Sequence, residues 1–113
     1  MSIEAKLAEM NLTLPPPSPK GGVYQSMLVV GDQALFSGHV PVLPDGSMLT
    51  GRVGDEVDLE AAQTAARQVG LCILATAKDN LGSLDRIKRV VKLFGMVNCT
   101  ADFKQHPQVI NGC

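Results

Sequence analysis

The sequence predicts an α+β domain whose elements follow the order β-β-β-α-β-α, with a mixed sheet and helices packed on one face. Two β-rich runs, 23–30 and 33–37, flank the turn pair Gly31-Asp32 and predict a hairpin. Residues 59–81 repeat apolar side chains at helical spacing, and the apolar run 90–97 predicts a buried strand. With 113 residues, the chain is sized for one domain.

The first twenty residues are expected to form a short helix followed by a proline-rich strap, and residues 21–113 to form the domain itself. Ser2 is a suitable N-cap for a helix with an apolar stripe at Ile3, Leu7 and Met10. Four of residues 15–19 are proline, which favours an extended path.

After the hairpin, Pro41 and Pro44 with the turn pair Asp45-Gly46 indicate an irregular path into a third short strand at 48–50. Gly51 and Gly54 follow, but they do not complete a phosphate-binding glycine motif.

The long helix has clear signals at both ends. Asp58 is a good N-cap and Gly82 is expected to close the helix. Gly70 inside it predicts close packing of the helix on the sheet. Cys72 lies on the apolar face and is expected to be an inert core residue.

A central strand is predicted from Val90 to Val97, followed by a second helix with Pro107 as its first residue and Val109 and Ile110 inside it. The sequence ends at Cys113, about two turns into that helix. We therefore expect the chain to be a fragment of a longer domain.

Composition and charge narrow the class of function. The formal net charge is −1, and the basic cluster Arg86, Lys88, Arg89 and Lys92 is better explained as a solvated strand edge than as an RNA surface, so no nucleic acid is expected. The three cysteines and two histidines show no zinc-like spacing, and neither a metal nor another cofactor is expected. No apolar run is long enough for a membrane span or secretory signal, so we expect a cytoplasmic, reduced protein without membrane partners.

The chain is apolar for its size, with 45% hydrophobic and 19% charged residues. This composition predicts that partner subunits cover part of the surface.

The most informative segment for function is Ser37-Gly38-His39, where an apolar strand ends before Pro41. Ser37 offers a hydroxyl and Gly38 a backbone without a Cβ, so a small polar ligand could reach the main chain there. The alternative is that Gly38 only marks a bulge or bend.

These features together resemble the Rid/YjgF family, and the resemblance covers most of the chain from Gly21 onward. It rests on Gly22-Val23-Tyr24, the hairpin into residues 36–41, the amphipathic helix, the 90–97 run and Asp102-Phe103 through Asn111. The strap at 14–17 is similar to one subgroup of the family.

The resemblance implies a chorismate-mutase-like fold, a homotrimer with clefts between subunits, and hydrolysis of small enamine and imine carboxylates to 2-keto acids and ammonia. Tyr24, Ser37 and Gly38 match the family's catalytic positions, while Asn111 and His39 match substrate-binding ones. His39, where many members have Gln, could equally be a hydrogen-bonded structural residue. Alternatives are a non-catalytic trimer that binds small carboxylates or amino-acid derivatives, and the ribonuclease activity claimed for some relatives.

The family's substrate-clamping arginine and late glutamate belong to strands that follow the second helix, beyond the last residue of this sequence. We therefore expect the 113-residue chain alone to be inactive, because a carboxylate substrate requires a bidentate guanidinium.

Overall fold

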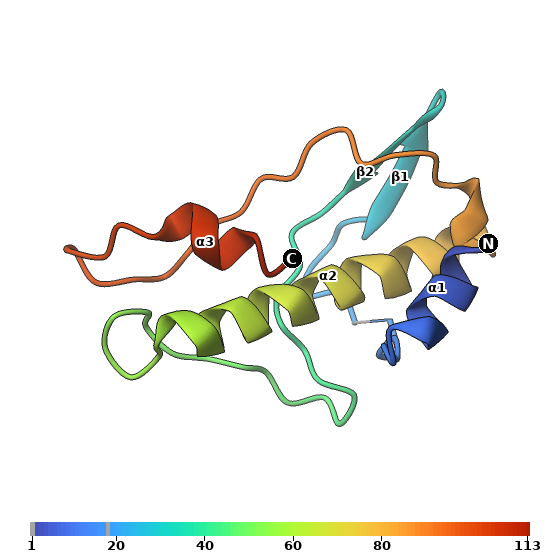
Figure 1. Cartoon of the computed structure of the whole chain (residues 1–113). Helices are drawn as coiled ribbons and strands as arrows, with labels where there is room; N and C mark the ends of the chain where they lie inside the picture. Colours follow the sequence, from blue (N-terminus) through green and yellow to red (C-terminus); the bar gives the residue numbers. More distant parts are fainter. Residues whose placement is uncertain (1, 18) are drawn as a thin grey trace.

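The computed structural model describes residues 2–17 and 19–113. One long helix, α2, crosses the middle of the molecule, and the other elements lie around it (Figure 1). The elements in chain order are α1 (Ile3–Glu9), β1 (Met27–Val30), β2 (Gln33–Phe36), α2 (Leu59–Leu81), the 3-10 turn η1 (Leu84–Arg86) and α3 (His106–Ile110). Within the described residues no helix is long and apolar enough to cross a membrane.

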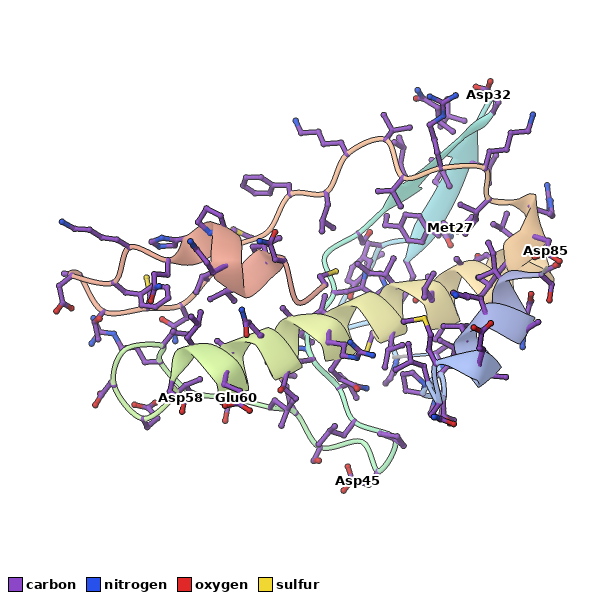
Figure 2. The ribbon with its side chains drawn as sticks, in the orientation of Figure 1. Met27, Asp32, Asp45, Asp58, Glu60 and Asp85 are labelled. Carbon is purple, nitrogen blue, oxygen red and sulfur yellow. The ribbon has the colours of Figure 1, made fainter. Side chains whose placement is uncertain are left out.

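The predicted hairpin is present. Strands β1 and β2 pair antiparallel, with Met27 opposite Phe36 and Val30 opposite Gln33, so the turn falls at Gly31-Asp32 as expected. Met27 is buried where the hairpin meets α2, and Asp32 lies at the exposed tip (Figure 2).

The third strand predicted at 48–50 does not form. Val42 and Met48 make one isolated bridge, and the loop between them turns at Asp45 on the other side of α2 from the hairpin tip (Figure 2). Pro41 and Pro44 lack the backbone N–H that a longer ladder would need, which explains why the pairing stops at one bridge.

Helix α2 begins and ends at the predicted residues. The Asp58 carboxylate accepts a hydrogen bond from the Ala61 amide at 2.8 Å, and Gly82 closes the helix with a φ of 81°. The inward face of α2 carries small side chains, so neighbouring elements approach it closely. Its buried residues are Ala62, Ala66, Cys72, Ala75, Thr76 and Ala77.

The core around the first half of α2 joins the loop before this helix with the C-terminal segment. Val53, Ala62, Ala66 and Val109 form its buried centre. Phe103 and other partly buried apolar residues pack against it.

The N-terminal helix docks against the far end of α2 through η1. Ser2 caps it as predicted, by accepting a hydrogen bond from the Ala5 amide. The Ile3 amide donates to Asp85 at 2.8 Å, and Glu4 accepts from the Leu84 amide at 3.1 Å. Figure 2 shows Asp85 beside the start of α1.

The strand predicted from Val90 to Val97 does not form. This segment is extended but lies outside the assigned strands, and its backbone makes no hydrogen bonds to the rest of the described chain. In the part of the chain that the structure describes, the sheet has two strands, and neither of them pairs with residues 90–97. Without a neighbouring strand, a β-forming run has no ladder to complete.

The second helix was predicted correctly, but the role expected of Gly70 was wrong. Helix α3 has Pro107 in its first turn and buries Val109. A Cβ added at Gly70 would lie 3.2 Å from the Cys113 carbonyl oxygen. Gly70 therefore admits the end of the α3 segment, not the sheet.

Candidate functional site

The chain changes direction at the end of β2, and Ser37 is fixed there by the neighbouring segment. The Ser37 amide donates to the Ser26 carbonyl at 3.0 Å, and its hydroxyl donates to the Gln25 carbonyl. With its proton committed in this way, the Ser37 hydroxyl oxygen is left as an acceptor.

Gly38 lies in open surroundings. A Cβ built on it would meet nothing within 4 Å, and its φ is outside the left-handed region. Its amide has no acceptor among the described residues. A ligand therefore has room to reach this amide directly.

His39 is held at both ring nitrogens. Nδ1 lies 2.7 Å from the Ser37 carbonyl oxygen, and Nε2 lies 2.8 Å from the hydroxyl of Thr76 on α2. Since a carbonyl can only accept, Nδ1 carries a proton, and in the neutral ring Nε2 accepts from the Thr76 hydroxyl. His39 thereby fixes the Ser37-Gly38 segment to the long helix.

Tyr24 lies on the segment that leads into β1, next to Gln25, whose carbonyl accepts the hydrogen bond from the Ser37 hydroxyl. Its hydroxyl oxygen accepts a hydrogen bond from the Gly21 amide at 2.9 Å, which leaves its own proton free to donate. The side chain is 42% exposed. The structure thus places Tyr24, Ser37, Gly38 and His39 on two adjacent segments.

Asn111 is elsewhere. It ends α3 and lines a groove of about 350 Å³ together with Glu60, Gln63, Thr64, Arg67 and Gly112. Arg67 in this groove and Thr76 beside His39 lie about 14 Å apart along the axis of α2. Among the described residues, no hydrogen bond joins Asn111 to Ser37 or Gly38.

Sequence analysis missed the α2 residues that hold this region. The Gln68 amide nitrogen donates to the Val42 carbonyl at 2.7 Å, and the Cys72 thiol donates to the same oxygen at 3.3 Å. Thr76, only 3% exposed, holds His39. A polar residue on the apolar face of a helix was the available signal, because a buried hydroxyl requires a partner.

A larger groove of about 580 Å³ lies between α1, the strap and the C-terminal half of α2. Leu7, Leu12, Pro15, Lys78 and Asp79 are among its lining residues, and none of the predicted site residues reaches it. Among the described residues, no cluster of three or more His, Cys, Asp or Glu side chains could hold a metal ion.

Comparison with known proteins gives consistent matches over nearly the whole chain. Residues 4–113 match the family described as "YjgF/chorismate mutase-like, putative endoribonuclease". The chain is 34% identical to Protein TCP17 of Trypanosoma cruzi over 110 residues, which cover 97% of this chain and 69% of TCP17.

Two solved structures are similar to this one. The first, described as "a putative endoribonuclease" from Shewanella oneidensis MR-1, superposes with a TM-score of 0.95 at 30% identity, covering 99% of this chain and 74% of that protein. The second is Atu1372 of Agrobacterium tumefaciens, described as having unknown function. It gives a TM-score of 0.87 at 37% identity and covers 98% of this chain and 68% of its own.

The contact between Thr76 and His39 gives a stability prediction. Thr76→Val keeps the shape of the side chain but leaves His39 Nε2 without its donor, so we expect a loss of about 1–2 kcal/mol in the free energy of unfolding. Urea denaturation measures it. Thr76→Ser, which keeps the hydroxyl, is the control and should retain the His39 signal in an NMR spectrum. Equal His39 environments in the Val variant and the parent would contradict the assigned bond.

Proposed function

The chain belongs to the YjgF/chorismate-mutase-like family, and we propose that it hydrolyses small 2-imino carboxylates and their enamine tautomers at clefts between subunits of a homotrimer. The products are a 2-keto acid and ammonia. The observation that carries this proposal is the arrangement of free donors and acceptors around Gly38.

Three groups at the end of β2 have hydrogen-bonding capacity to spare. The Gly38 amide and the Tyr24 hydroxyl can each donate, while the Ser37 hydroxyl oxygen can accept. Two donors suit a carboxylate or a developing negative charge, and an acceptor suits the attacking water. The open space at Gly38 lets a planar substrate approach the main chain.

The proposed reaction makes modest demands on these groups. The water oxygen adds to the imine carbon while the nitrogen gains one proton from the water. The new hydroxyl then gives its proton to the nitrogen as the C–N bond breaks, which leaves the keto group and ammonia. Ser37 orients the water, and the Tyr24 and Gly38 donors hold the substrate. The enzyme contributes mainly orientation, which can account for several kcal/mol of the barrier.

The reason for placing the site between copies is that Asn111 lines a groove to which neither Ser37 nor Gly38 contributes. A neighbouring subunit could present its Asn111 groove to the Gly38 segment. An extensive exposed apolar surface is available for such contacts. It comprises Leu28, Val29, Val30, Leu35, Phe36, Val90, Val91, Leu93, Phe94 and Met96.

A second candidate, a non-catalytic trimer that binds small carboxylates, is favoured by the state of His39. Both of its ring nitrogens are engaged within the chain, so it has no free lone pair with which to act as a base. The same donors at Tyr24 and Gly38 would hold a carboxylate without turning it over.

We expect the protein to assemble into trimers, because association removes the exposed apolar surface of the hairpin and residues 90–97 from water. Sedimentation equilibrium at micromolar concentration should give three times the chain mass. Phe94→Lys should shift the equilibrium toward monomer, with the exposed Met10→Lys as its matched control. A monomer in the parent protein would remove the inter-subunit site.

The activity is tested by supplying 2-aminoacrylate from an amino-acid dehydratase and following semicarbazide capture of the imine. Two proteins are compared, the 113-residue chain and a chimera that adds the family's remaining strands after Cys113. We expect faster turnover from the chimera than from the 113-residue chain, because a residue that clamps the substrate carboxylate contributes orders of magnitude in kcat/KM.

The same samples separate the alternatives. Saturable pyruvate binding without turnover in the chimera would support the non-catalytic trimer. Cleavage of single-stranded RNA, with no imine hydrolysis, would overturn both candidates. Robust imine hydrolysis by the short chain would show that the anchor lies within it, with Arg52 the next residue to test.

Gly38→Val should impair ligand binding more than folding. The valine methyl groups would occupy the space in which a ligand meets the main chain, while the backbone conformation tolerates a side chain. Calorimetric titration with pyruvate and thermal melts of the chimera measure the two effects, and Gly38→Ala should fall between valine and glycine. Normal binding by a strongly destabilised valine variant would show that Gly38 is structural.

A further inference from the structure

We propose that Cys99 and His106 form a thiol–imidazole pair at which hydrogen peroxide oxidises Cys99 to a sulfenic acid. The pair lies at the start of α3, at the opposite end of this short helix from Asn111. It is independent of the proposed imine chemistry and makes no use of Ser37, Gly38 or Tyr24.

The geometry is that of a nucleophile beside its base. The Cys99 sulfur lies 3.2 Å from His106 Nε2, within hydrogen-bonding distance for a thiol donor. Cys99 is half-buried and His106 is exposed, so a small solute can reach the pair from solvent. The two residues lie on different segments, since Cys99 bridges to Val53 and His106 opens α3.

Neighbouring groups hold both partners in place. The Phe103 ring meets the His106 ring edge-on, with centroids 5.4 Å apart, and Phe103 is itself packed against the core. Arg52 Nε donates to the Cys99 carbonyl at 3.3 Å, and the Arg52 amide donates to the Glu56 carboxylate at 2.8 Å, so side chains of both charges lie near the pair. Reactive cysteines are partly exposed, as Cys99 is.

The other two cysteines lack these features. Cys72 is 1% exposed and its thiol donates to the Val42 carbonyl, so solvent cannot reach it. Cys113 is exposed, but burial of its sulfur raises the pKa of its thiol, and it has no imidazole partner among the described residues. The chain therefore contains one thiol beside an imidazole, Cys99, and two thiols for comparison, the buried Cys72 and the exposed Cys113.

The oxidation balances without any further reagent. As the Cys99 sulfur attacks one peroxide oxygen, its proton passes to His106 Nε2, an S–O bond forms and the O–O bond breaks. Sulfur loses two electrons to the peroxide, and the leaving hydroxide takes the proton from His106 to become water. The product is a sulfenic acid, the first and reversible step of cysteine oxidation.

Dimedone trapping after brief exposure to dilute peroxide tests the proposal on the 113-residue chain. Trypsin places each cysteine in its own peptide, because cleavage after Arg67, Lys78, Lys92 and Lys104 releases 68–78, 93–104 and 105–113. Dimedone adducts, unlike a simple gain of oxygen, are not confused with oxidation of Met96 in the same peptide. We expect 93–104 to be labelled at least about tenfold faster than 105–113, and 68–78 to remain unlabelled.

His106→Gln should reduce labelling of Cys99 to the level of Cys113, whereas Gln108→Ala on the same helix should leave the ratio unchanged. A general loss of stability would also equalise the two labelling rates, but it would expose the buried Cys72, so peptide 68–78 must remain unlabelled in the His106→Gln variant. Equal labelling of Cys99 and Cys113 in the parent chain, or an unchanged ratio in His106→Gln, would overturn the proposal.

Discussion

Close approach to one face of α2 is the constraint on which the rest of the structure depends. Small side chains along this face allow the loop after β2, the C-terminal segment and η1 to come within hydrogen-bonding or van der Waals distance of a single helix. Larger residues at Ala66 or Gly70 would push these elements outward together, because interiors are packed too densely to absorb added volume locally. The position of Ser37 and Gly38 is therefore determined by the small side chains of α2 as well as by the strand β2 that precedes them.

The elements that the sequence predicted well are those whose causes are local. Asp58 and Gly82 satisfy the ends of α2 with atoms a few residues away, so their roles can be read from spacing alone. The hairpin turn at Gly31-Asp32 is local in the same sense. The strand predicted from Val90 to Val97 was wrong because a strand forms only by pairing with a neighbouring strand. The apolar pattern contains no information about whether such a neighbour is present.

The predictions at the candidate site divide in the same way, into local features that the sequence indicates and contacts between distant residues that it does not. Gly38 could be singled out from its residue type, and sequence analysis left His39 open between a ligand-binding and a structural role. Only the structure reveals that Thr76, far along the chain, engages its second ring nitrogen. Cys99 and His106 were considered for metal ligation by their spacing, whereas their contact depends on how the 99–106 loop turns back. Family membership adds a chemistry to consider but does not choose among activities, since one fold supports many sites.

The exposed run from Val90 to Val97 has a calorimetric consequence. Val90, Val91, Phe94 and Met96 each leave more than three quarters of their surface in contact with water in the folded chain. Unfolding a single chain hydrates little new surface at these side chains, so its heat-capacity increment should fall below the usual value of about 12–15 cal/mol/K per residue. In the proposed trimer, burial of the same side chains would lower the heat capacity on association. Part of the hydrophobic stabilisation would then come from the proposed assembly and depend on protein concentration.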